Sequence, residues 1–582
     1  MLYFLPFLFT AVLSGPAYIV DQAGSTPEAF PYTDLHRWGV RQVVGGGVDC
    51  SSYLRAIPGG PWYDAAGEAM VAKSIAANRA EIDAAHAQGM QIFLTSDLFQ
   101  FPTLLLKRYA SEVTWPNSTC YSYTRGPTCI DLRANATQVF LRLLFDEVKA
   151  TFPTLDGLVL RYGENSPCAE HQGNAPFDTS DAIPSLQRLL VFLREELCVR
   201  RNLTVLFRTW DTSTQALHAN ASFYAAVVGA VQPHPRLVFS IKHTALDFWR
   251  RTAVNPTLGV GAHGQVVEAE VAGMYFACGS SPLYIGHSLI NGYAENSPPV
   301  GLQALFAANP ALLAGVLTNH QCPEITPTAP YFWPRLEQGV ISAWAANPAA
   351  SEEAAFLAYA AADLGLTGAP AAALRALALA AMDAHLHMWT VAAFDPIVNP
   401  AQLDRPTANW LVRGGFGGLW QLDPTGHEGD CHAYNLSHCM VFPFLGASGG
   451  FPAALAEKEA AAAAFSAINS SAYADVAPAL RTDLAQGLRA STELGAFNAA
   501  IAAVGWRVMA LGWQGEKAGV YNVTGLRQAI AEYDRLWGEY RLLPGKLPGY
   551  VVNGSMMSDR FWVHPSTGQP GMGQSVDKFR GV

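Results

Sequence analysis

The chain has 582 residues, of which 50% are hydrophobic and 14% are charged, and its net charge is −10. This length is typical of two or three domains, and the apolar fraction supplies a large buried core. The acidic balance and the lack of a basic stripe argue against binding to nucleic acid, because nothing is present to neutralise phosphates. The composition indicates a folded, soluble globular protein.

The first 18 residues are apolar and contain no Lys or Arg. A Leu/Phe-rich stretch over 2–13, followed by Ser14-Gly15-Pro16-Ala17, predicts a signal peptide and therefore a secreted protein or one of the secretory pathway. No stable membrane insertion is expected, because the stretch is short and is interrupted by Pro6 and Pro16. The alternative is that these residues belong to a buried strand or helix of the protein itself.

Glycosylation sequons are unusually frequent. Eight of the 20 Asn residues lie in Asn-X-Ser/Thr, where chance would give about two or three. They are Asn117, Asn135, Asn202, Asn220, Asn435, Asn469, Asn522 and Asn553. The excess predicts a glycoprotein of the secretory pathway.

The nine cysteines include no Cys-X-X-Cys pair, which fits an oxidising compartment and disulfide bonds. Close spacing favours loop disulfides for Cys120 with Cys129 and for Cys431 with Cys439. Further candidates are Cys168, Cys198, Cys278 and Cys322, and Cys50 is left over. The alternative is that most of the thiols are free and buried.

Short apolar runs alternate with helical stretches in the first part of the chain. Buried strands are predicted over 39–45, 91–98, 157–164, 204–211, 237–244 and 266–272, with helices such as 69–88 and 136–152 between them. Two later units, 283–290 and 312–318, are less clear. The alternation predicts parallel strands with crossover helices. The number of units favours a (β/α)8 TIM-type barrel over a doubly wound sheet.

The composition becomes Ala-rich and helical in the last two fifths of the chain. Helices are predicted over 351–364, 371–390, 452–468, 477–509 and 524–542. The expected organisation is a signal peptide over 1–18, a barrel over 30–347 and a mostly α-helical C-terminal domain over 348–582.

Polar and aromatic side chains stand at the ends of several predicted strands, where an α/β barrel carries its active site. Glycosidic cleavage needs two carboxyl groups, one acid and one base or nucleophile, and Glu164 and Asp247 follow two of these strands. Trp210 and Trp249 could stack on a sugar ring. Candidate ligands for hydroxyls or a carboxylate are Arg161, Arg208, Lys242, His243, Glu268 and Glu270.

Each of these residues also has a structural explanation. Glu164 and Asp247 could cap the helices that follow them. Arg208 and Lys242 could pair with barrel carboxylates such as Glu268 and Glu270, and the tryptophans could be core residues.

Four segments together resemble the family-67 glycoside hydrolases, which are α-glucuronidases. They are SIKHTALDFWRRTAVNPTLG over 240–259, DGLVLRYGENSPCAEHQGN over 156–174, and LAGVLTNH over 313–320 with FWPRLEQGVISAWAANP over 332–348. The resemblance implies that Glu164 is the general acid and that Asp247 is one of two carboxylates that activate water in an inverting mechanism. It also implies action on uronic-acid side groups of plant polysaccharide, with no metal or organic cofactor.

One position departs from the family pattern. The second base of the family is a Glu directly before a Tyr, and here Met274 precedes Tyr275. A thioether cannot accept a proton from water. Glu270 lies on the same strand face, but the intervening four residues of strand span ~13 Å, so it cannot take over that position. The sequence therefore predicts either an inverting glycosidase or a catalytically impaired carbohydrate-binding or structural barrel.

Overall fold

The computed structural model describes residues 17–21, 30–48, 54–98, 101–114, 130–131, 134–163, 179–211, 216–245, 248, 253–271, 282–294, 296, 298–319, 332–389, 391, 442–540 and 576–582. Eight parallel strands in this part of the chain form a closed barrel in sequential order. They are β1 (Ala17–Asp21), β2 (Gln42–Gly47), β3 (Gln91–Asp97), β4 (Gly157–Gly163), β5 (Thr204–Asp211), β6 (Leu237–Lys242), β7 (Gln265–Glu270) and β8 (Leu313–Asn319). The predicted fold class is thus confirmed.

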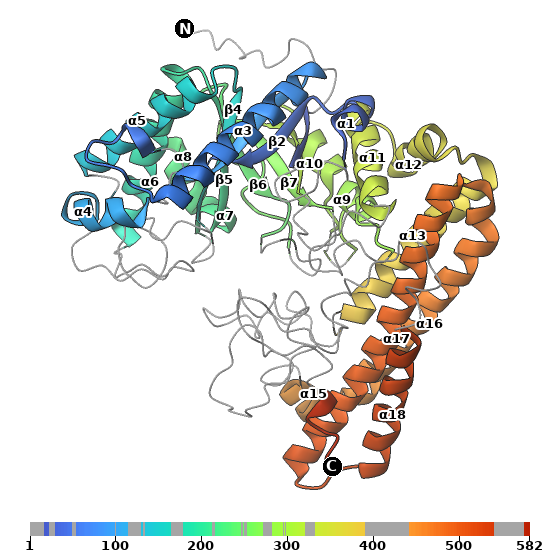
Figure 1. Ribbon diagram of the computed structural model, residues 1–582. Coiled ribbons are helices and arrows are strands. Elements are labelled where there is room, and N and C mark those ends of the chain that lie inside the picture. The colour runs from blue at the N-terminus through green and yellow to red at the C-terminus, as the bar shows by residue number, and fades with distance from the viewer. Residues whose placement is uncertain are drawn as a thin grey trace.

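Helices connect the strands and surround the barrel (Figure 1). They are α1 (Tyr32–Arg37), α3 (Ala65–Ala87), α4 (Thr103–Val113), α5 (Asn135–Thr151), α6 (Thr179–Leu193), the π-helix η2 (Arg194–Val199), α7 (Ala216–Ala219), α8 (Ala221–Gly229), α9 (Gly286–Asn291), α10 (Leu302–Ala308) and α11 (Phe332–Ala346). Helix α5 illustrates why they pack there. Its buried residues include Phe140, Leu141, Leu144, Phe145 and Val148, which fall on one helical face.

The barrel interior is a packed core. One apolar side chain from each strand contributes to a separate buried cluster, formed by Ile19, Val44, Phe93, Val159, Leu206, Val238, Val266 and Leu317. All residues of β6 and β7 are buried, because these strands contact the interior on one side and helices on the other. Side chains two and four positions further along the strands therefore project into the same interior, nearer the carboxyl-terminal mouth.

The C-terminal part of the chain forms a helical extension beside the barrel (Figure 1). It contains α12 (Glu352–Tyr359) with the π-helix η4 (Ala360–Leu364), α13 (Gly368–Trp389), α15 (Phe442–Ser448), α16 (Phe451–Ser471), η7 (Ala472–Val476), α17 (Thr482–Ala518) and α18 (Val523–Tyr540). Within the described residues, α17 alone is long and apolar enough by composition to span a membrane as a single helix. Its apolar window is 78% buried inside the protein, so packing against α16 and α18 explains its composition.

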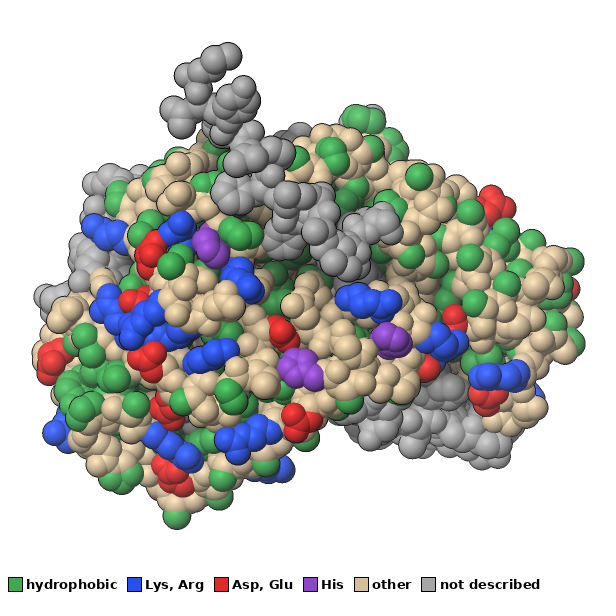
Figure 2. All heavy atoms as spheres, turned by 90° about the horizontal axis from the view of Figure 1, so that it is seen from above, with side chains coloured by type: hydrophobic (Ala, Val, Ile, Leu, Met, Phe, Trp, Pro, Cys, Tyr) green, Lys and Arg blue, Asp and Glu red, His purple; other side chains and the backbone are tan. Residues whose placement is uncertain are grey.

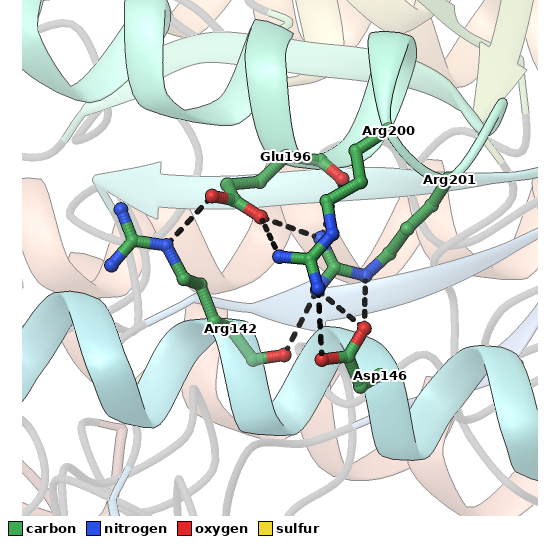
Figure 3. A network of polar contacts seen from close by, with 5 residues as sticks. All are labelled: Arg142, Asp146, Glu196, Arg200 and Arg201. Carbon is green, nitrogen blue, oxygen red and sulfur yellow. Dashed lines mark hydrogen bonds and ion pairs between the residues drawn. The ribbon is translucent and has the colours of Figure 1, made fainter.

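Figure 3 shows a network of ion pairs that fastens η2 to α5 on the outside of the barrel. The buried Arg201 guanidinium contacts the Asp146 carboxylate at 2.6 Å and the Glu196 carboxylate at 2.8 Å. Arg142 donates to Glu196 at 2.6 Å. The Arg142 and Arg201 hydrogen bonds lower the pKa of Glu196, although burial alone would raise it. This network stabilises the helical layer and lies outside the barrel interior.

Surface charges on the face shown in Figure 2 are mixed. Acidic and basic side chains are interspersed with hydrophobic ones, and no patch of a single sign covers that face. This arrangement agrees with the lack of a basic stripe in the sequence.

Three expectations are corrected by the fold. The barrel begins before residue 30, because β1 pairs with β2 and β8, and two residues of the expected 1–18 leader lie in this strand. The unit over 283–290 is not a strand, since α9 begins at Gly286. Cys198, a candidate for a disulfide, is a buried free thiol whose Sγ lies 3.3 Å from the Arg236 carbonyl oxygen.

Candidate active site

The candidate site is the carboxyl-terminal mouth of the barrel interior, where β5, β6 and β7 place polar side chains side by side. Arg208 on β5 is paired in register with Ser240 on β6, and Lys242 on β6 is paired with Glu268 on β7. Each lies an even number of positions beyond an interior apolar residue of its strand, Leu206, Val238 or Val266. Strand alternation therefore turns all four side chains into the barrel.

Arg208 and Glu268 form a buried two-point ion pair. Arg208 Nε donates to Glu268 Oε2 at 2.9 Å, and Arg208 Nη2 donates to Oε1 at 2.5 Å. Ser240 Oγ donates to Glu268 Oε2 at 3.0 Å. The structural explanation offered for Arg208 is therefore correct, and Ser240, which sequence reasoning missed, completes the contact.

The charge of Glu268 is stabilised by its neighbours. Glu268 is only 1% exposed, and burial alone would raise the pKa of its carboxyl group. The Arg208 guanidinium, the Lys242 ammonium and the Ser240 hydroxyl outweigh burial and hold the pKa below its ordinary value. The carboxyl group of Glu268 is thus charged at neutral pH, which suits charge balance and ligand orientation.

Lys242 lies between two aromatic rings. Its Nζ is 3.7 Å from the centroid of Trp210 and 4.2 Å from the centroid of Phe248, and the residue is 3% exposed. Such contacts hold an ammonium group by attraction to the ring faces. Trp210 also packs edge-on against His218 at 5.1 Å between ring centroids. Trp210 is therefore buried and helps to hold Lys242 in place.

The remaining candidates lie at or just after the carboxyl-terminal ends of β4, β6 and β7. Arg161 on β4 makes a two-point contact with Asp97 on β3, at 2.7 and 2.8 Å. His243 follows β6, is buried, and packs edge-on against Tyr293. Glu270 and Asn319 are buried and paired in register at the ends of β7 and β8. Asp97 and Asn319 were missed by sequence reasoning, although their position at strand ends was a usable signal.

Another buried carboxylate lies on α11. Glu337 on α11 accepts hydrogen bonds from the backbone N–H groups of Ile285 and Gly286, the latter at 2.8 Å. Burial, with a smaller contribution from the charge of Glu270, raises the pKa of Glu337 well above its ordinary value. Glu337 therefore anchors the segment that leads into α9.

Glu352 on α12 anchors the same segment from the other side. Tyr284 Oη donates to its Oε1 at 2.5 Å, Arg375 Nη2 donates to its Oε2 at 2.5 Å, and His287 Nδ1 lies 3.0 Å from Oε2. Burial alone would raise the pKa of Glu352, but these hydrogen bonds lower it to about 2. The C-terminal helices α12 and α13 are therefore tied to the connection between β7 and β8.

The predicted catalytic pair and its surroundings lie outside the described residues. These positions are Glu164, Asp247, Trp249, Met274 and Tyr275. Glu164 comes directly after Gly163, the last residue of β4, and Asp247 comes directly before Phe248. In the part of the chain that the structure describes, no group of three or more His, Cys, Asp or Glu side chains could hold a metal ion.

The fold defines a (β/α)8 barrel with a C-terminal helical extension. No protein-family model matches the sequence, and no curated protein matches it. Among solved structures, the chain is similar to a GH138 enzyme targeting pectin rhamnogalacturonan II, with a TM-score of 0.50 and 12% identity over 97% of this chain and 67% of that one. A family 89 glycoside hydrolase from Clostridium perfringens has a TM-score of 0.44 and 11% identity over 97% of this chain and 68% of that one. The first likeness shows that this chain shares its fold with that enzyme, and neither structure is a family-67 enzyme.

Proposed function

We propose that this protein is a glycoside hydrolase that binds carbohydrate at the carboxyl-terminal mouth of the barrel. The observation that carries the proposal is the buried set of Arg208, Glu268 and Lys242, converging from three neighbouring strands of a barrel whose fold is shared with glycoside hydrolases. Buried charges held in fixed geometry are costly and concentrate at functional sites. At this end of a (β/α)8 barrel they are suited to orienting a polar substrate.

Two carboxyl groups would perform the reaction. In this proposal Glu164 donates a proton to the leaving oxygen, and Asp247 takes a proton from the attacking water, so that the anomeric configuration is inverted. Both positions follow or adjoin described elements of the mouth: Glu164 succeeds β4, and Asp247 precedes Phe248, whose ring contacts Lys242. The substrate class is a glycoside carrying a uronic acid, for which the resemblance to the family-67 segments and the buried Lys242 ammonium give support.

The proposal includes a secretory location. It is supported by the apolar segment before β1 and by the number of glycosylation sequons. Disulfide bonds among the cysteines other than Cys198 belong to the same proposal.

The second candidate is a carbohydrate-binding barrel without catalytic activity. Met274, which stands where the family pattern has a Glu, favours this alternative. It shares the fold and the mouth with the first candidate, and only turnover separates the two.

The test is a screen of aryl glycosides and aryl uronides with the purified full chain, followed by NMR of the first sugar anomer released. A glycosidase of the proposed kind hydrolyses at least one substrate with inversion, and Glu164→Gln lowers the rate on an unactivated glycoside by about 10²-fold or more. Asp247→Asn abolishes turnover but retains sugar binding. Glu539→Gln, at an exposed position on α18, is the control and leaves the rate unchanged.

The outcomes separate the candidates. Binding of a sugar without turnover, measured by calorimetry, selects the binding protein. Release of a sugar that keeps the anomeric configuration of the substrate contradicts the inverting mechanism. An unchanged rate for Glu164→Gln contradicts the assignment of Glu164 as the acid. Loss of both binding and turnover in Asp247→Asn assigns that residue a structural role.

A further inference from the structure

The sequon asparagines differ in exposure from the other asparagines of the chain. Five sequons lie in the described residues: Asn135, Asn202, Asn220 and Asn522 are exposed, and Asn469 is half-buried. Among the eight described asparagines outside sequons, four are buried, namely Asn78, Asn255, Asn319 and Asn498. Four of the five sequon asparagines are therefore accessible at the surface, whereas the Oδ1 atom of Asn469 is buried.

Two of these asparagines stand at the start of a helix and use only the oxygen of the side-chain amide. Asn220 Oδ1 accepts a hydrogen bond from the backbone N–H of Phe223 at 3.0 Å and caps α8. Asn522 Oδ1 accepts from the backbone N–H of Gly525 at 3.0 Å at the start of α18. Such caps satisfy backbone donors that have no partner within the helix.

The amide nitrogen Nδ2 is the second polar atom of each of these side chains. Among the described residues, Nδ2 of Asn220 and Nδ2 of Asn522 have no hydrogen-bond partner. Beside Asn522, a Cβ atom added to Gly525 would lie only 2.7 Å from Nδ2. Glycine at 525 therefore leaves the space next to this nitrogen open.

We infer that Asn220 and Asn522 carry N-linked oligosaccharides on Nδ2 while Oδ1 of each continues to cap its helix. This inference rests on the secretory location in the proposed function. The donor is a lipid-pyrophosphate-linked oligosaccharide of the secretory pathway. The bond between Nδ2 and the sugar C1 forms, the C1–O bond to the pyrophosphate breaks, Nδ2 gives up one proton, and the lipid pyrophosphate leaves.

The chemistry leaves the cap intact. The product is a secondary amide, which retains the carbonyl oxygen and one N–H. A cap that uses Oδ1 therefore tolerates a substituent on the nitrogen. A side chain that needed both amide atoms for internal hydrogen bonds would not.

Matched variants separate the glycan from the cap. Ser222→Ala and Thr524→Ala remove the sequon hydroxyls, which are exposed, and keep both asparagines. Asn220→Ser removes Nδ2 and keeps a side-chain oxygen that can cap α8, whereas Asn220→Ala removes both. Each variant is made in the full chain with its own N-terminus and expressed in a eukaryotic secretory host.

The measurement is peptide mass mapping before and after treatment with a peptide N-glycosidase, which converts a glycosylated Asn into Asp. The expected result is conversion at Asn220 and Asn522, with loss of one glycan each in Ser222→Ala and Thr524→Ala. After enzymatic removal of all glycans, Asn220→Ala is expected to melt about 1–2 °C below Ser222→Ala, because it alone lacks the cap.

Unmodified Asn220 and Asn522 peptides in the secreted protein would overturn the inference, as would a full chain that stays unmodified inside the host cell. These readouts do not depend on hydrolysis. A protein with glycosylated sequons but no glycosidase activity would contradict only the proposed function. An active glycosidase with unmodified sequons would contradict only the present inference.

Discussion

Arg208 and Glu268 face each other across β5 and β7 and are joined by two parallel hydrogen bonds in the barrel interior. The strand between them, β6, supplies the Ser240 hydroxyl to the same carboxylate. Both charged residues are at least 95% buried. The pair therefore resists solvent screening and is a fixed element of the mouth.

Removing the negative partner of this pair is expected to be costly. Glu268→Gln leaves the Arg208 guanidinium buried without its counter-charge, which should lower the free energy of unfolding by roughly 3–5 kcal/mol. The double variant Arg208→Met with Glu268→Met should recover much of that loss, because neither charge remains. Denaturant unfolding measures both, with Glu539→Gln as the surface control. A single variant as stable as the wild type would show that water or other groups neutralise Arg208.

Lys242 is expected to distinguish acidic from neutral sugars. Lys242→Met preserves the packing between Trp210 and Phe248 but removes the charge, so binding of a uronide should weaken by at least tenfold while binding of the matching neutral glycoside changes little. Calorimetric titration of both ligands gives the comparison. Lys73→Met on the exposed face of α3 is the control. Equal weakening for both ligands would indicate that Lys242 supports the fold of the mouth and does not bind the carboxylate of the uronide.

The side chain at position 274 is expected to determine the rate of hydrolysis. Met274→Glu restores a carboxylate where the family pattern has its second base, and we expect a higher rate on any substrate that the wild type hydrolyses. Met274→Gln, which is polar but cannot accept a proton from water, is the control. If the two variants have the same rate, the pocket is arranged differently from the family pattern.

The acid stability of the protein is expected to depend on Glu352. Its pKa is about 2 in the folded protein, below the ordinary value of 4.5, so its ionisation contributes stability that is fully present above about pH 4.5 and is lost as the pH falls towards 2. Glu352→Gln removes the charge and should flatten this part of the stability profile. Glu353→Gln, at the exposed neighbouring position, should leave the profile as in the wild type. Unfolding midpoints measured from pH 2 to 7 test the pair, and parallel profiles for both variants would contradict the assignment.

Much of the barrel could be predicted from sequence because strands buried on both sides appear as continuous apolar runs. The runs at 91–98, 157–164, 204–211, 237–244 and 266–272 all contain observed strands. The first two residues of β1 fell within the segment assigned to a leader, because a short apolar segment near the N-terminus has the same composition in either role. The segment 283–290 was ambiguous for a similar reason, since a brief apolar run does not distinguish a buried helix from a strand.

The candidate site was predictable in part. Strand parity placed Glu270 on the same strand face as position 274, and Glu268, Arg208 and Lys242 were candidates that the structure brings together in one mouth. Pairing could not be deduced, because whether Arg208 contacts a neighbour or a ligand depends on the register between strands. The hydrogen bonds of Glu337 and Glu352 were also beyond sequence reasoning, since α11 and α12 reach the segment before α9 only through tertiary packing.

The register between Ile19 and Leu317 joins the first and last strands of the barrel. A nascent chain leaving the ribosome must therefore wait for almost three hundred further residues before β1 finds its second neighbour. Until then the growing sheet has two open edges, which are templates for pairing with other chains. Closure of the barrel between β1 and β8 is therefore expected to be a late event in its folding.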